Sequence, residues 1–195
     1  NPEIIRILTD AVADINVRSK NGMTPPMYAA KANQNPEAIK NILDAGADVN
    51  ARTTKKIEDF GNAEGVTPLM LAAQYNQNPE VIKVLLGAGA DVNARDKILG
   101  FTPLVLAAGW NQNPEVIKLL LDAGADVNAR DKDGLTPLMW AALLNQNPEI
   151  TKILLDAGAD GKAKSNVGKT AFDYARGNEH IKGTEVYWLL NDAQY

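Results

Sequence analysis

The clearest hydrophobic pattern lies in residues 131–164, where apolar positions fall at the spacing of two short helices. Leu138 and Ala142 share one helical face, and a second apolar set with helical spacing follows in residues 150–155. Residues three or four positions apart lie on the same side of an α-helix, so both sets predict helices with one buried face. Neither helix is long enough to be stable alone in water, and we expect packing between neighbouring units to stabilise them.

Capping residues predict where the two helices begin and end. Thr136 followed by Pro137 predicts the start of the first helix, with threonine as the N-cap and proline at the first helical position. Asn147 precedes a second Pro-Glu start, and Gly158 predicts the C-terminal end of that helix, because glycine tolerates a positive φ. The unit is therefore predicted to be a turn, a short helix, a second helix and an extended return.

The same unit recurs along the chain. One column of it is occupied by proline, at Pro2, Pro36, Pro79, Pro114 and Pro148. Successive members of this column are 34, 43, 35 and 34 residues apart, a period typical of stacked repeats. We expect one domain, residues 1–195, divided into a partial repeat (1–18), four full repeats (19–52, 53–95, 96–130, 131–164) and a C-terminal capping repeat (165–195).

Two motifs recur in most units: T-P-L-M-x-A-A, at 67–73 and 136–142, and A-G-A-D-V-N-A-R-D, at 88–96 and 123–131. Together with the leucine-rich second helix, they resemble the motifs of ankyrin-repeat proteins. The resemblance implies an all-α fold, an ankyrin-repeat solenoid of stacked helix-turn-helix units with extended finger turns. N-Q-N-P replaces the family's usual inter-helix loop. The family's usual histidine is replaced by Met27, Met70, Val105 and Met139, so its hydrogen bonds must come from elsewhere or be missing.

The capping repeat departs from the other units. There, G-K-T-A-F replaces the G-x-T-P-L pattern, as expected near the end of an array. We expect the final helix to begin near Thr184 and to bury Val186, Trp188 and Leu189. A polar outer face on this helix would then prevent further stacking.

One turn is longer than the others, because residues 53–66 extend it by about nine residues relative to the turn after Arg130. Repeat proteins place insertions in loops on one face, which is often the binding face. Lys55, Lys56 and Phe60 are therefore candidates for an insertion finger that clamps a partner. The alternative is a solvated loop without a role.

Residues that vary between units are the candidates for specific recognition. In ankyrin proteins, partners usually contact the turn tips and the first helices, which line a concave face. Carried over by position, the resemblance implies exposed protein-binding residues at Met23, Val66, Tyr75, Phe101, Trp110, Leu135, Leu143 and Leu144. An exposed apolar patch with large aromatic residues usually marks an interface. Alternatively, Tyr75, Trp110 and Leu144 pack against the N-Q-N-P loops.

Composition restricts the possible chemistry. The chain has no cysteine, one histidine (His180) and a net charge of -4, which argues against thiolate metal sites, nucleophile–base pairs and general attraction to nucleic acid. No apolar run is long enough to span a membrane. Glu58, Asp59 and Glu64 come closest to a cation site, but their spacing matches no known loop.

We therefore predict a non-enzymatic interaction module that binds a protein or peptide on its concave face, without catalytic residues, cofactor, metal, nucleic acid or membrane. The alternatives are a targeting or structural ankyrin segment of a larger multidomain protein, and an engineered repeat scaffold. The first helix of the unit at 1–18 is missing, so a monomer with weak self-association through its uncapped N-terminal helix is expected. The lack of cysteine fits an intracellular, cytoplasmic location.

Overall fold

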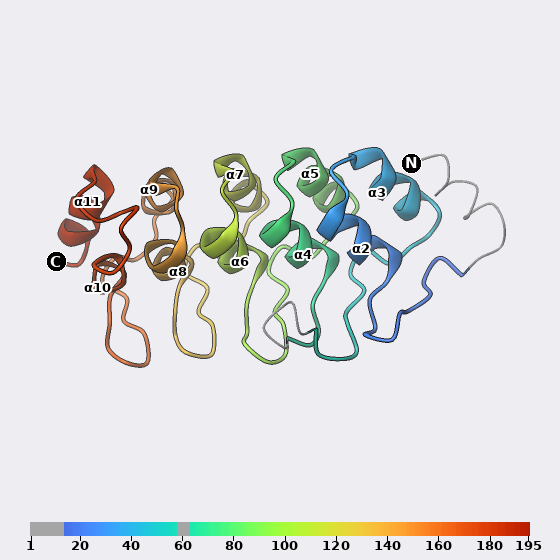
Figure 1. Ribbon diagram of the computed structural model, residues 1–195, viewed down its shortest axis with the longest axis horizontal. Helices are drawn as coiled ribbons and strands as arrows, with labels where there is room; N and C mark the ends of the chain where they lie inside the picture. The colour runs from blue at the N-terminus through green and yellow to red at the C-terminus, as the bar shows by residue number, and fades with distance from the viewer. Residues whose placement is uncertain (1–13, 58–62) are drawn as a thin grey trace.

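The computed structural model of the chain describes residues 14–57 and 63–195. These residues form one row of paired helices, with the finger turns gathered along one edge of the row (Figure 1). Ten α-helices lie in the described part: α2 (Pro25–Ala32), α3 (Pro36–Asp44), α4 (Pro68–Tyr75), α5 (Pro79–Gly87), α6 (Pro103–Trp110), α7 (Pro114–Asp122), α8 (Pro137–Leu144), α9 (Pro148–Asp156), α10 (Ala171–Ala175) and α11 (Glu185–Ala193).

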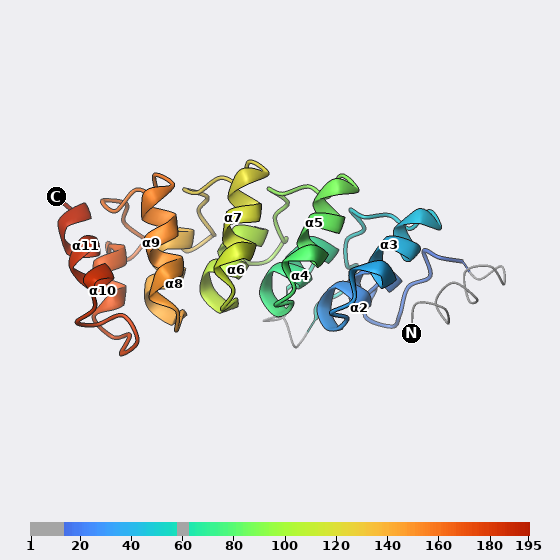
Figure 2. The same cartoon turned by 90° about the horizontal axis from the view of Figure 1, so that it is seen from above.

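The helices are stacked in two layers. The first helix of each pair packs on the first helices of its neighbours, from α2 through α4, α6 and α8 to α10. The second helices α3, α5, α7, α9 and α11 stack in the same way, as Figure 2 shows from above. Each pair therefore contacts mainly the pairs before and after it, which confirms the predicted all-α solenoid.

Threonine caps begin most of the first helices. The side chains of Thr67, Thr102 and Thr136 accept hydrogen bonds from the backbone N–H three residues later, at 3.2–3.3 Å. These bonds satisfy an amide that has no partner within the helix. At the start of α2, Thr24 Oγ1 is buried without a hydrogen-bond partner, and its backbone N–H contacts the sulfur of Met27 at 3.4 Å. The capping prediction is therefore confirmed in the later pairs but not in the first.

The second helices begin and end as predicted. Asn78 Oδ1 accepts from the Glu80 N–H at 3.0 Å, and the equivalent asparagines before α3, α7 and α9 do the same. Gly89 follows α5 with a φ of 85°, a conformation that residues with a Cβ rarely adopt. These local signals recur in each unit, so the chain turns at the same points in each unit.

Small residues bring the first helices together. Ala72 and Ala73 in α4 and Ala107 and Ala108 in α6 are fully buried, and Leu104 fills the space beside them. Because alanine side chains are short, the neighbouring helices approach closely and their larger residues interdigitate. The main core therefore runs the length of the stack as one continuous cluster.

Buried asparagines connect successive pairs. Asn111 is fully buried, and its side-chain amide donates to the carbonyl oxygens of Ala73 and Asn76 in the preceding unit, at 2.8 and 3.0 Å. Asn76, Asn145 and Asn178 form the same two bonds to the units before them. The first asparagine of N-Q-N-P thus satisfies carbonyl groups at the C-terminal end of a neighbouring helix, while its second asparagine caps the next helix.

The last helix differs from the expectation in which residues it buries. α11 begins after Thr184, as predicted, and buries Val186 together with Leu190. Trp188 and Leu189 are 58% and 37% exposed, so the prediction that they are buried is wrong. The reason is helical phase: Val186 and Leu190, four positions apart, face α9 and α10, whereas Trp188 and Leu189 point outward.

Candidate interaction surface

Three aromatic side chains from neighbouring units form one cluster beside the finger turns. The Phe101 ring lies 6.0 Å from that of Trp110 and 5.3 Å from that of Trp140, and the two indoles are 5.1 Å apart between ring centres. Trp140 Nε1 donates to Asp131 Oδ2 at 2.8 Å, which fixes the orientation of its ring. Phe101 is buried, whereas both tryptophans are half-buried and present part of their surface to solvent.

Four of the predicted binding residues are buried, and the expectation that they are exposed is wrong. The four side chains precede the helix-starting threonine, and their exposed fractions are at most 8%: Met23, Val66, Phe101 and Leu135. Met23, Val66 and Phe101 pack in a second core cluster beneath the fingers, and Leu135 packs in the main core.

Hydrogen bonds at the base of each finger explain this burial. Phe101 N–H donates to Asp96 Oδ2 at 2.6 Å, and Leu135 N–H donates to Asp131 Oδ1 at 2.8 Å. Val66 N–H and Met23 N–H make equivalent bonds to the side-chain oxygens of Thr53 and Ser19. Each bond closes the finger and directs the side chain of the donating residue into the stack, whereas its position in the repeat had implied exposure.

The other predicted residues remain at least partly accessible. Tyr75 and Trp110 are half-buried and pack against the second core cluster, and Leu143 packs against the main core. Leu144 is 43% exposed. Lys31 Nζ lies 5.1 Å from the centre of the Tyr75 ring, within the range of a cation–π contact.

Trp140 is the aromatic residue that position-by-position reasoning left out of the candidate set. It occupies the column before the alanine pair, which holds the exposed Tyr28 in α2 and the buried Leu71 and Leu106 in α4 and α6. The larger indole cannot be enclosed in the same way, and part of it reaches the surface beside Trp110. Aromatic residues at two of the four positions in this column were the available signal.

The insertion after Thr53 is attached to the core at its base. Ile57 N–H donates to the Ala63 carbonyl at 2.9 Å, and both side chains are buried in the second core cluster. Lys55 and Lys56 are exposed, as expected of an insertion finger. The third candidate residue in the finger, Phe60, lies outside the described residues. At its base, the insertion is packed against the protein.

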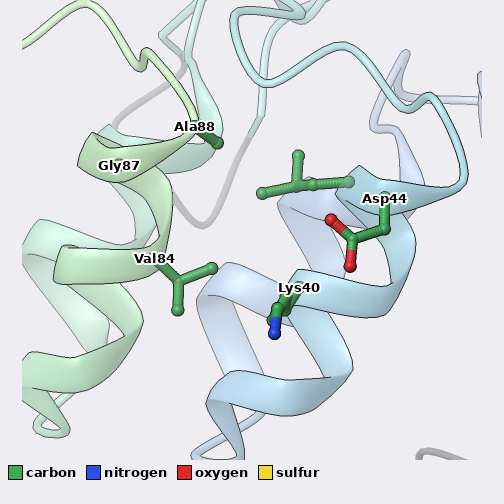
Figure 3. A pocket seen from close by; sticks show the side chains of 6 residues that line it. Lys40, Asp44, Val84, Gly87 and Ala88 are labelled. Atoms are coloured by element: carbon green, nitrogen blue, oxygen red, sulfur yellow. The ribbon is translucent and has the colours of Figure 1, made fainter.

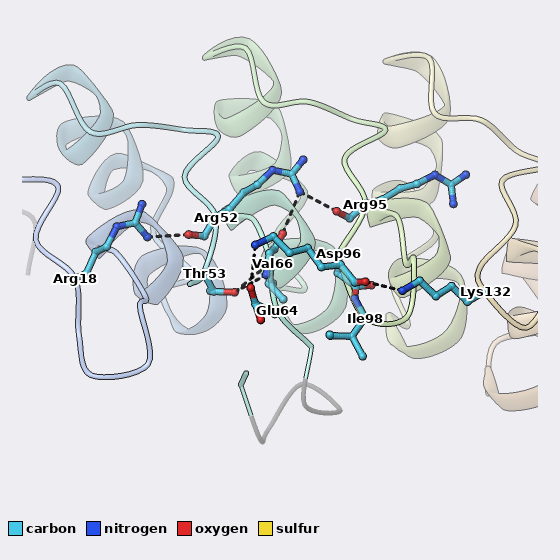
Figure 4. A network of polar contacts seen from close by, with 11 residues as sticks. Arg18, Arg52, Thr53, Glu64, Val66, Arg95, Asp96, Ile98 and Lys132 are labelled. Atoms are coloured by element: carbon cyan, nitrogen blue, oxygen red, sulfur yellow. Dashed lines mark hydrogen bonds and ion pairs between the residues drawn. The ribbon is translucent and has the colours of Figure 1, made fainter. Parts of the chain in front are cut away.

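Arginines form a row along the finger turns (Figure 4). Arg18, Arg52 and Arg95 each donate from Nη1 to the carbonyl oxygen of the next arginine in the row, at 2.7, 2.8 and 2.6 Å. Arg52 and Arg95 also donate to glycine carbonyls within their own turns. The guanidinium groups are thus held in place by backbone oxygens of adjacent units.

A family model described as "Ankyrin repeats (3 copies)" matches the chain in four overlapping segments, residues 1–96, 53–131, 69–165 and 104–193. These segments cover nearly the whole sequence. The chain belongs to the ankyrin-repeat family. A search of curated proteins found no match. Ankyrin repeats generally serve as protein–protein interaction modules, and the aromatic cluster and the arginine row both lie where this ankyrin array is accessible to a partner.

The surface of the ankyrin array also contains a shallow pocket of about 270 Å³ between α3 and α5 (Figure 3). It is lined by Lys40, Leu43, Asp44, Val84, Gly87 and Ala88. One lysine and one aspartate on successive turns of α3 do not form a nucleophile–base pair or a set of metal ligands. The pocket therefore offers a small apolar hollow and no recognisable reaction centre.

The described residues offer neither a metal-binding cluster nor a membrane-spanning helix. They contain no group of three or more histidine, cysteine, aspartate or glutamate side chains placed to hold a metal ion. Glu64, one of the candidate cation ligands, instead pairs with Lys97 at 2.9 Å, while Glu58 and Asp59 lie outside the described residues. His180 is exposed in the cap. In the same part of the chain, no helix is long and apolar enough to cross a membrane.

Proposed function

We propose that this ankyrin array binds a protein or peptide partner on the face formed by its first helices and finger turns. The observation that carries the proposal is the accessible apolar strip at the ends of three successive first helices. Tyr75, Trp110 and Leu144 are the last residues of α4, α6 and α8, and Trp140 packs on Trp110. Half-buried aromatic residues held by their neighbours lose little conformational entropy on binding, which suits them as interface anchors.

The proposal includes no reaction. The described residues contain no group of three or more histidine, cysteine, aspartate or glutamate side chains that could hold a metal ion, and ankyrin repeats typically act as binding modules. Specificity then depends on shape and charge along the face, and we propose that the exposed Lys55 and Lys56 of the insertion finger contact one end of a partner. Concave-face binding of this kind needs only rigid anchors, which the packed tryptophans supply.

The test is a selection of displayed random peptides on the immobilised protein, followed by binding measurements with the selected peptides. Leu144→Ser removes an exposed apolar side chain from the strip and is expected to weaken binding of the selected peptides by roughly tenfold. Leu189→Ser is the matched control, because Leu189 is 37% exposed on α11, in the other layer. Equal binding by wild type and both variants would remove the first-helix face from the function.

A further inference from the structure

Charged residues are divided unevenly between the finger turns and the rest of the molecule. The finger segments are residues 18–24, 52–66, 95–101, 130–135 and 164–169. In their described part they contain eleven lysines and arginines against four carboxylates, and residues 58–62 add two acids to the sequence. The remaining described residues contain eight bases and sixteen acids. A chain with a net charge of -4 therefore has one positively charged edge.

Three of the four described carboxylates of the fingers do little to offset this edge, and the exposed Asp133 is the exception. Asp96 and Asp131 are 3% and 8% exposed and accept backbone hydrogen bonds inside their turns. Glu64 is already paired with Lys97 at 2.9 Å. The surface of the fingers is consequently dominated by cations, and a positive surface favours anionic partners.

The arginine row gives this charge a fixed geometry. Its members donate to carbonyl oxygens, which orient the guanidinium groups without neutralising their charge. Among the described residues, Arg18, Arg52, Arg95 and Arg130 form no ion pair. Figure 4 shows Arg18, Arg52 and Arg95 in line, one from each successive turn. A planar guanidinium held in place is well suited to donate paired hydrogen bonds to a carboxylate.

We infer that the arginine row binds an extended acidic segment of the protein partner, with a carboxylate at about every third residue. Neighbouring packed helices are roughly 8–10 Å apart, and the arginines repeat once per unit. A polyproline II segment has three residues per turn and advances about 3.1 Å per residue, so every third side chain faces the same way and successive ones are about one unit apart. The inference rests on the proposed function, because it assumes that the partner is a polypeptide, and it names the chemistry of that partner.

The overall charge favours an acidic polypeptide over nucleic acid. Nucleic-acid-binding domains usually have a pI above about 9, whereas the pI here is about 5.1. A long polyanion would extend past the row towards the second helices and return turns, where the exposed acid Asp126 has a counterpart in each full unit and Asp122 has one in most of them. A short acidic segment confined to the fingers avoids that repulsion.

The test uses two fluorescein-labelled synthetic peptides of identical composition. In one, glutamate occupies every third position, with serine and glycine between; in the other, the glutamates form one block. Fluorescence anisotropy at low and physiological salt is expected to show tighter binding of the spaced peptide and weaker binding as salt rises, because exposed ion pairs are screened. Equal affinity for the two peptides would overturn the proposed register, and no binding of either would overturn the inference.

Variants assign the binding to the row. Arg52→Gln with Arg95→Gln is expected to weaken binding of the spaced peptide roughly fivefold or more, because two exposed ion pairs are lost. Lys40→Gln with Lys83→Gln removes the same charge from α3 and α5 and is expected to leave binding unchanged. Since Arg52 and Arg95 also join adjacent turns, Lys20→Glu with Lys55→Glu provides a second test on exposed side chains, with the same expected loss.

Other outcomes separate the inference from the proposed function. Equal affinity for single-stranded oligothymidylate would indicate a general polyanion surface and would overturn the choice of an acidic polypeptide. Salt-sensitive dimerisation that the peptide inhibits would mean that the arginine row binds the acidic surface of a second copy of the chain, and this result would overturn the inference. If the displayed peptides bind through Leu144 but are insensitive to the arginine variants, the proposed function stands and this inference fails. If peptide binding depends on the arginines but not on Leu144, the inference about the arginine row is supported and the first-helix face is not.

Discussion

A single side-chain oxygen at the start of each finger turn controls the direction of the residue that precedes the first helix. Ser19, Thr53, Asp96, Asp131 and Ser165 occupy this position, and each accepts a hydrogen bond from the backbone near the end of its turn. Either a hydroxyl or a carboxylate can fill this position, because both provide an oxygen that accepts the backbone hydrogen bond. Burial of Phe101 is thus a consequence of a local hydrogen bond as well as of its apolar side chain.

Replacing Asp96 by alanine tests this role. Its carboxylate accepts from the N–H groups of Ile98, Leu99 and Phe101, and alanine would leave these amides without their acceptor. We expect Asp96→Ala to lower the free energy of unfolding by about 1–3 kcal/mol, measured by urea denaturation. Asp133→Ala, at an exposed carboxylate of the next turn, is the control and should cost much less. Similar losses for the two variants would contradict the proposed role of the buried oxygen.

Asp173 gives the stability a component that depends on acid pH. The Thr170 N–H donates to its carboxylate at 2.9 Å, and this hydrogen bond lowers the pKa of Asp173 below its usual value near 3.8. A lowered folded-state pKa stabilises the protein above the unfolded pKa, and this stabilisation is lost as pH falls through the lowered value. We expect thermal midpoints of Asp173→Asn to fall less steeply than wild type below about pH 4. Parallel curves would show that the hydrogen bond does not contribute.

How far individual residues could be predicted depends on how local their determinants are. Thr136 and Asn147 were correctly predicted as caps, because a cap needs only the few residues that follow it. Phe101 and Leu135 were wrongly expected at the surface, because their direction depends on an oxygen four or five residues earlier and on the packing of the surrounding units. Trp140 was missed because its exposure follows from its size relative to the leucines in its column.

Between elements, the asparagine after each first helix from α4 onward joins its unit to the preceding one by hydrogen bonds. Its amide reaches two carbonyl groups of the unit before it, while its own oxygen accepts the N–H of the capping asparagine two residues later, as Asn111 does with Asn113. One side chain therefore joins two units and also shapes the loop to the second helix. N-Q-N-P could be recognised from the sequence as a recurring motif. Its bonds to the preceding unit could not be predicted, because they form only when the units stack.

Asn111→Ala is expected to be more damaging than Asn33→Ala. Asn111 is fully buried and bonds to α4, whereas Asn33 is half-buried and bonds within the described residues to its own loop. Removing the first leaves buried carbonyl groups without a donor, which costs about 1–3 kcal/mol. Chemical denaturation of both variants compares the two costs directly. Equal destabilisation would mean that the bonds to the preceding unit add nothing beyond the local loop contact.

Across the whole molecule, stability is expected to be a sum over neighbouring pairs. Each helix contacts its own partner and the equivalent helices on either side, so pairs in the middle of the row have two neighbours. Residues 1–13, which include most of the predicted partial repeat and its uncapped helix, lie outside the described part of the chain. The predicted self-association through that helix therefore stays a prediction.

Hydrogen exchange can measure this distribution of stability. We expect the slowest amide exchange in α4 to α7, which pack between neighbours on both sides, and faster exchange in α2, where the threonine cap is absent, and in the short α10. Mass spectrometry of pepsin fragments would resolve these segments. Uniform protection from α2 to α11 would show that the helix pairs unfold only all together, which would contradict a stability that is the sum of interactions between neighbouring pairs.

The asparagine bonds also have a consequence for how such a chain can change length. The joint between units is chemically identical at Asn76, Asn111 and Asn145, so each boundary can accept any of these units. Excising residues 111–144 would bring Asn145 to the end of α6, where its amide would find the carbonyl oxygens that Asn111 now binds. We expect the shortened chain to remain helical and cooperative in thermal circular dichroism. Interchangeable joints let whole units be lost or duplicated while the binding residues at their tips vary independently.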